Sequence, residues 1–248
     1  MDSNILTSAS SSTMDFCYTE PANSKMVQDP QIDLEAYMAA YSGHSRTDRL
    51  LFIAKVCPTL RQESLIMALD AIKADTLDVE KYKSVVQLLG PDAHNVDHTW
   101  IGNAKQKAHD SHARLETELV AYKSSLIKES IRLGLLSLAS HYYSTCDLLN
   151  AVKTFTKTRD YCTTHQQVLA MCLGVVQCSL ELGNYNHMST YIIKARSNLT
   201  DESSVNTENE LKVYQALVYL AANNYKMCAQ ELLSIQVDTF QPLSVLHN

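Results

Sequence analysis

The sequence predicts an all-α protein: a right-handed α-solenoid of tetratricopeptide-like helical hairpins, preceded by an N-terminal helical segment. Three observations support this fold class. Only six glycines and five prolines occur in 248 residues, which suits long helices joined by short turns. Apolar residues recur every three to four positions, as on one face of a helix. A short turn pattern returns three times in the second half, as repeat proteins require.

A tail and a helical segment precede the repeats. Residues 1–30 are rich in Ser, Thr and Asn, with too little apolar surface to offset the entropy of ordering, so we expect a disordered tail. Residues 31–123 are the predicted N-terminal helical segment. Its helices are expected over residues 32–41, 47–56, 60–74 and 79–89, with a turn at residues 42–45, and a long helix with sparse apolar positions over residues 96–122.

Two antiparallel helices are predicted between residues 127 and 162, as the first repeat. Asp147 follows a break in the apolar pattern and can cap the second helix. The first helix places Ile127, Ile131, Leu135, Leu138 and Tyr142 on one face, and the second places Leu148, Ala151, Val152 and Phe155 on a matching face. The small residues allow close approach of the helices.

Three turns set the register of three repeats over residues 124–236. The turn residues are Cys146, Gly183 and Asn223, separated by 37 and 40 residues, against about 34 in a standard tetratricopeptide repeat. Each turn is followed by a small or short apolar residue and, four positions later, by a larger one: Ala151 and Phe155, Met188 and Ile192, Cys228 and Leu232. A polar loop is predicted at residues 197–210 and an irregular tail at residues 237–248.

Composition excludes several classes of protein. No run of about 18 apolar residues predicts a membrane span, and no basic and then apolar N-terminus predicts a secretory signal. A formal net charge of −6 argues against a general nucleic-acid binder. The seven cysteines form no CxxC pair, and the odd count favours reduced thiols in the cytosol or nucleus. We expect neither a nucleic-acid nor a membrane partner.

One pair of histidines has the spacing of a metal site. His94 and His98 are four residues apart, with Asp97 between them, and could bind zinc from one helix face. His109 and His112 lie too far along the same helix to complete the site, so we interpret this stretch as an exposed helix start. No nucleophile elbow, Gly-rich phosphate loop or kinase signature occurs. We therefore expect no catalytic residue, cofactor or metal.

Basic residues gather in the first repeat. They are Lys128, Arg132, Lys153, Lys157 and Arg159. Lys128 and Arg132 share a helix face, while Glu129 is expected to face elsewhere. The functional interpretation is a contact for an acidic partner; the alternative is an ordinary solvated face.

Several stretches resemble a known family. Residues 126–132 (LIKESIR), 141–143 (HYY) and 158–164 (TRDYCTT) strongly resemble the first subunits of the COP9 signalosome, a PCI/Rpn7-type family, as do residues 33–37, 41–43 and 49–54. Trp100 and Met171 with Cys172 also fit, and the resemblance covers about residues 32–233. The equivalent proteasome-lid subunit shares the architecture but fits the Arg-Asp-Tyr-Cys-Thr stretch less well.

The resemblance implies a non-catalytic scaffold that contacts other signalosome subunits and cullin-RING ligase components in the nucleus and cytoplasm. That complex removes Nedd8 from cullins, using a metalloprotease in a different subunit. Family members continue into a PCI domain, whereas this sequence ends at Asn248, so a truncated isoform, a fragment or a diverged paralogue is expected. Two alternatives stay open: a proteasome-lid subunit fragment, and a small helical metal-dependent hydrolase centred on His94 and His98.

Overall fold

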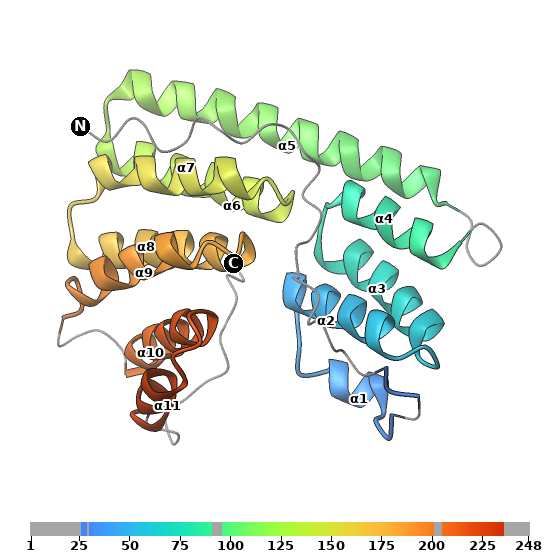
Figure 1. Ribbon diagram of the computed structural model, residues 1–248. Coiled ribbons are helices and arrows are strands. Elements are labelled where there is room, and N and C mark those ends of the chain that lie inside the picture. Colours follow the sequence, from blue (N-terminus) through green and yellow to red (C-terminus); the bar gives the residue numbers. More distant parts are fainter. Residues whose placement is uncertain (1–25, 29, 91–95, 201–204, 236–248) are drawn as a thin grey trace.

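The protein is an all-α helical solenoid, which confirms the predicted fold class (Figure 1). The computed structural model describes residues 26–28, 30–90, 96–200 and 205–235. Within these ranges the elements are helices: α1 Leu34–Met38, α2 Gly43–Val56, α3 Arg61–Asp75, α4 Val79–Leu89, α5 His98–Ser125, α6 Lys128–Ser144, α7 Leu148–Thr158, the 3-10 helix η1 Arg159–Tyr161, α8 His165–Glu181, α9 Tyr185–Arg196, α10 Val205–Ala221 and α11 Tyr225–Leu233.

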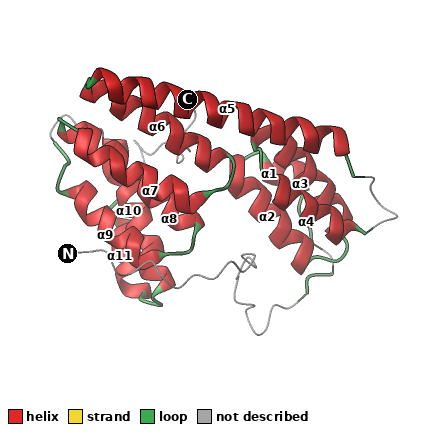
Figure 2. Cartoon of the chain, turned by 90° about the horizontal axis from the view of Figure 1, so that it is seen from above, coloured by secondary structure: helices red, strands yellow, loops and turns green. Residues whose placement is uncertain are grey.

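The long helix α5 joins two limbs of the molecule. Figure 1 shows α1 to α4 below one end of α5 and α6 to α11 below the other, and Figure 2 shows α5 lying across both. Its first turns place Trp100 and Ile101 against the core of the N-terminal limb, and its last turns bury Leu119 against α6. Most side chains between these contacts are exposed, which explains the sparse apolar pattern of this helix.

The N-terminal limb has its own core, which contains Met38, Leu50, Leu69, Ile72 and Tyr82. Its helix α2 begins at Gly43, so the prediction of a turn at residues 42–45 and a helix start at residue 47 is wrong. His44 is buried in the first turn of α2, and Thr47 is buried at the start of the second turn. Packing therefore extends the helix into a segment whose Gly and Ser residues favour a turn.

The three predicted repeat turns share one conformation. Cys146, Gly183 and Asn223 all have left-handed backbones, with φ of 61°, 65° and 56°. In each turn the next N–H donates to the carbonyl five residues earlier, as from Asn184 to Ser179. These are the bonds of a Schellman motif. The residue that donates this bond also caps the next helix with its side chain: Asp147, Asn184 and Asn224.

The small or short apolar residue that follows each repeat turn is buried. Ala151 and Met188 are fully buried and Cys228 is 9% exposed, as the repeat register predicts. Phe155 and Ile192 are also buried, but Leu232 is 46% exposed, so the predicted inward position of Leu232 is wrong. Phe155 packs under α8 and Ile192 lies in the same core, whereas no described helix follows α11 to cover Leu232.

The inner face of α6 differs from the predicted one at two positions. Ile131, Leu135 and Leu138 are buried as expected, but Ile127 is 57% exposed. Tyr143, rather than Tyr142, is the buried tyrosine. Tyr142 is half-buried, and its hydroxyl lies 2.9 Å from His112 Nε2 on α5.

A polar seam connects the two limbs beneath α5. The Leu77 N–H donates to the Ser144 carbonyl at 3.2 Å. The rings of His44 and Tyr143 meet edge to face, with centroids 5.2 Å apart, and Cys146 Sγ lies 3.8 Å from His44 Nδ1. These contacts join α2 and the start of α4 to the first repeat.

Several predictions lie partly or wholly outside the described residues. Among them are the predicted tail at residues 1–30, of which only residues 26–28 and 30 are described, the predicted tail at residues 237–248, and His94. The predicted polar loop at residues 197–210 is shorter than expected, because α10 begins at Val205. None of the helices in the described ranges is long and apolar enough to cross a membrane.

Candidate protein-binding site at the end of the first repeat

Exposed basic side chains gather where the first repeat begins and ends. Lys128 starts α6, Lys157 is in the last turn of α7, and Arg159 follows in η1. Because α6 and α7 are antiparallel and η1 contacts α6, these residues lie at the same end of the hairpin. Lys153 lies one turn earlier on the exposed face of α7. No ion pair with another described residue involves any of these four side chains.

Arg132 does not belong to this exposed set. It is 9% exposed, and its Nε and Nη2 atoms donate to the two Glu129 carboxylate oxygens at 2.9 and 2.5 Å. The prediction that Glu129 faces elsewhere is therefore wrong. Residues three apart are neighbours on a helix, and this pair is a bidentate ion pair. Arg132 has an internal role, and its charge is neutralised within the first repeat.

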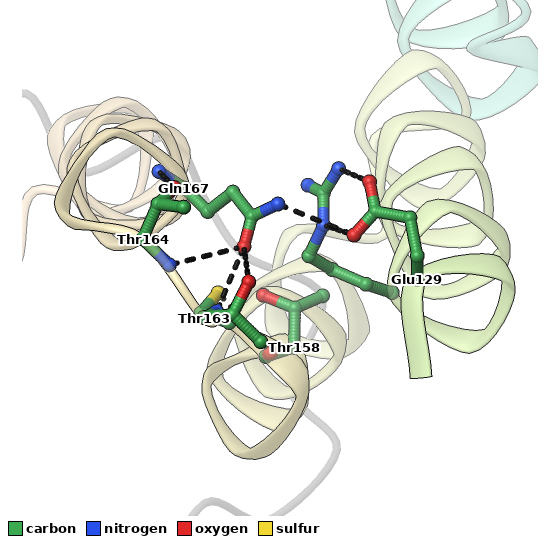
Figure 3. A network of polar contacts seen from close by, with 7 residues as sticks. Glu129, Thr158, Thr163, Thr164 and Gln167 are labelled. Atoms are coloured by element: carbon green, nitrogen blue, oxygen red, sulfur yellow. Dashed lines mark hydrogen bonds and ion pairs between the residues drawn. The ribbon is translucent and has the colours of Figure 1, made fainter. Parts of the chain in front are cut away.

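Glu129 also ties α6 to the start of α8 (Figure 3). The Gln167 Nε2 atom donates to Glu129 at 3.2 Å, and Gln167 Oε1 accepts from the Thr163 N–H at 2.8 Å. Thr164 and Gln167 form a reciprocal capping box at the N-terminus of α8. These bonds fix the segment between η1 and α8 against α6.

The electrostatics of this network keep it ionised. The hydrogen bond from Arg132 lowers the pKa of Glu129, and the same bond raises the pKa of Arg132. Burial raises the pKa of the nearby Cys162 thiol, whose Sγ donates to the Thr158 carbonyl at 3.3 Å. The Cys162 thiol is therefore neutral. The network of Glu129, Arg132 and Gln167 holds the start of α8 against α6.

A shallow groove lies beside this basic end, between α5 and α6. It has a volume of about 540 Å³, and Leu119, Val120, Lys123 and Leu138 are among its lining residues. Leu126 and Ile127, in the turn that follows α5, are exposed. The groove is open and mixed in polarity, which suits contact with a protein surface.

The alternative metal site of His94 and His98 stays a prediction, because His94 lies outside the described residues. His98 is the exposed first residue of α5, while Asp97 caps α5 and pairs with Lys73 at 2.9 Å. The Trp100 N–H and Lys73 lower the pKa of Asp97 to about 2. Within the described residues, no group of three or more His, Cys, Asp or Glu side chains could hold a metal ion.

The sequence contained signals for part of this site. The spacing of Glu129 and Arg132 is that of an i, i+3 ion pair, and Thr164 with Gln167 fits a capping box. The contact between Gln167 and Glu129 joins residues 38 positions apart, and no local pattern announces it.

Comparison with known proteins identifies the family. The family model described as 26S proteasome subunit RPN7 matches residues 97–243, from the start of α5 through the repeats. COP9 signalosome complex subunit 1 of Arabidopsis thaliana is 33% identical over 92% of this chain and 53% of its own length. Subunit 1b of Drosophila melanogaster is 31% identical over 86% of this chain and 51% of its own length.

A fission-yeast relative shows the same pattern. COP9 signalosome complex subunit 1 of Schizosaccharomyces pombe is 28% identical over 84% of this chain and 50% of its own length. The chain thus spans about half the length of these curated relatives. The relatives that match most of this chain are first subunits of the COP9 signalosome. The chain belongs to the family of 26S proteasome subunit RPN7.

Proposed function

We propose that this chain is a non-catalytic scaffold subunit of the COP9 signalosome. It supports removal of Nedd8 from cullin-RING ubiquitin ligases by holding other proteins in place. Its partners are other signalosome subunits and components of those ligases, in the nucleus and the cytoplasm. The observation that carries this proposal is the similarity over 92% of the chain to a protein named COP9 signalosome complex subunit 1.

The architecture is consistent with a scaffold. A stack of helical hairpins offers extended surfaces to other proteins, since each repeat contacts only its neighbours. The exposed basic end of the first repeat is our candidate contact, through Lys128, Lys153, Lys157 and Arg159. The match of residues 97–243 to the proteasome subunit model favours one rival, a subunit of the proteasome lid.

A tagged pull-down of this chain from its native cells tests the proposal. Size-exclusion chromatography and mass spectrometry then identify the co-purifying proteins. We expect other signalosome subunits in one large complex. Recovery of proteasome-lid subunits would instead support the rival function, and recovery of the chain alone would contradict both.

Charge reversal tests the basic end within the same assay. We expect Lys128→Glu with Lys157→Glu to reduce the recovery of at least one partner, because the two side chains are exposed and make no ion pair with another described residue. Lys105→Glu with Lys107→Glu, both exposed in the third turn of α5, is the matched control with the same change in net charge. Equal loss in both variants would mean that only net charge matters.

A further inference from the structure

An apolar tip projects where α5 turns into α6. We call Val120, Lys123, Leu126, Ile127 and Lys128 the α5/α6 tip. Its three apolar residues are 68%, 80% and 57% exposed. Val120 and Lys123 also line the groove between α5 and α6, so the tip continues into a concave surface. Exposed apolar side chains at the end of a groove are a common feature of interaction sites.

The backbone at Leu126 holds this side chain at the turn between α5 and α6. Leu126 has a φ of 57° and a ψ of 17°, in the left-handed region that favours Gly or Asn. A leucine there is conformationally unfavourable, and with 80% of its surface exposed it gains little burial in return. The left-handed residue ends α5 and turns the chain into α6, as Cys146 does between α6 and α7. The exposed leucine side chain, rather than the backbone, is therefore the feature that an external partner would use.

Charge selects the kind of partner. Lys123 and Lys128 flank the apolar residues, and neither makes an ion pair within the described part of the chain. Lys157 and Arg159 lie at the same end of the repeat. The whole chain has a net charge of −6, so its average field repels acidic proteins, while this end attracts them. An acidic segment would therefore find its complement here.

The length of the groove fits a short helix. Its lining residues on α5 run from Ala113 to Lys123, about three turns or roughly 15 Å along the helix axis. An amphipathic helix of similar length can place anchors at i, i+3, i+4 and i+7 along such a groove. Glu116 lies toward the opposite end of the lining from Lys123. The occupant should therefore have its acidic residues toward the tip.

We propose that the α5/α6 tip and its groove bind an acidic, amphipathic helix of another protein. The apolar face of that helix covers Val120 and Leu126, and its carboxylates pair with Lys123 and Lys128. This deepens the proposed scaffold function, on which it rests, by assigning a surface and the chemistry of its partner.

A direct binding assay tests the proposal on the full isolated chain. The probe is a fluorescein-labelled helical peptide with a leucine stripe at i, i+3, i+4 and i+7 and glutamates on its flanks; a matched peptide has lysines in place of the glutamates. Fluorescence anisotropy should show saturable binding of the glutamate peptide, weakened by added salt. No saturable binding of the glutamate peptide, or equal binding of the lysine peptide, would overturn the proposal.

Variants separate binding from folding. Leu126→Gly should weaken binding about tenfold, through loss of a buried leucine at the interface, while leaving the thermal midpoint unchanged or higher, because Gly relieves the strain. Lys123→Glu with Lys128→Glu should also weaken it. Leu220→Ala, on the exposed face of α10, is the apolar control and should bind normally. Unchanged affinity of the Leu126→Gly variant would refute the assigned surface.

Because the assay needs no other subunit, its outcome is distinct from that of the pull-down. Peptide binding without co-purifying signalosome subunits would keep the surface and reject the scaffold assignment. Co-purification without peptide binding would keep the scaffold assignment and reject the surface.

Discussion

Gly174 shows how one missing side chain determines the packing of two repeats. A Cβ atom at this position would lie 2.8 Å from the Phe155 ring, closer than side-chain atoms pack. Phe155 is 3% exposed and holds α7 against α8. The Phe155 ring occupies the space that a larger side chain at position 174 would need. The residue at each of the two positions therefore limits the size of the other.

We expect Gly174→Ala to destabilise the protein by about 1–3 kcal/mol, because the ring must move within a packed core. The matched control is Gly102→Ala on α5, where a Cβ meets no atom within 4 Å. There the replacement should stabilise the helix by about 0.5–1 kcal/mol. Urea unfolding monitored by circular dichroism measures both. A Gly174→Ala variant as stable as the parent would show that the Phe155 contact is not tight.

At the residue scale, the sequence predicted buried positions better than polar partners. The periodicity of α6 correctly placed Ile131, Leu135 and Leu138 inside, but it chose Tyr142 where the structure buries Tyr143. Adjacent residues on a helix are separated by about 100°, and the direction of the neighbouring limb decides which is buried. The His44 ring, which lies against Tyr143, comes from a helix about 100 residues earlier.

At the element scale, the repeat turns were the most predictable feature. The aligned residues Cys146, Gly183 and Asn223 adopt the same left-handed conformation, and a capping Asp or Asn follows each. Local chemistry fixes such a turn, since only a few residues suit the left-handed position and the N-cap. Helix starts were less predictable: α2 and α10 begin earlier than expected because buried side chains, such as His44 and Asn209, continue the helix.

The shared turn geometry predicts opposite effects at equivalent positions. Gly183→Ala should destabilise the protein by about 1 kcal/mol, because a Cβ is unfavourable at a φ of 65° even in open space. Asn223→Gly, at a φ of 56° on the surface, should be neutral or stabilising by a few tenths of a kcal/mol. Thermal denaturation of the two variants tests this. A stabilised Gly183→Ala variant would contradict the left-handed turn.

At the scale of the whole molecule, the seam between the limbs contains a cluster of partly buried charges. Lys81 on α4 pairs with Asp48 on α2 at 2.6 Å, and both side chains are largely shielded from solvent. Glu181, the last residue of α8, interacts with both groups. Local periodicity does not reveal such a cluster, since its members come from three helices that only the tertiary fold brings together.

Burial is the main cause that raises the pKa of Glu181 to about 7, and repulsion from Asp48 adds to it. Lys81 and the hydrogen bond with Tyr143 act in the opposite direction. The position of Glu181 at the C-terminus of a helix is also unfavourable for a negative charge. The folded state therefore retains a proton that the unfolded chain has released near its ordinary pKa of 4.5.

This difference predicts a pH-dependent stability for the seam. A folded pKa above the unfolded value means that stability is lost as the pH rises from about 4.5 through 7, by at most about 3 kcal/mol. Glu181→Gln cannot ionise, so its stability relative to the parent should increase between pH 5 and pH 8 and then level off. Urea unfolding at several pH values measures that difference, with the exposed Glu63→Gln on α3 as the control expected to run parallel to the parent. A Glu181→Gln curve that also ran parallel would mean that the carboxylate at the seam is solvated, and that the limbs meet less closely there than these contacts indicate.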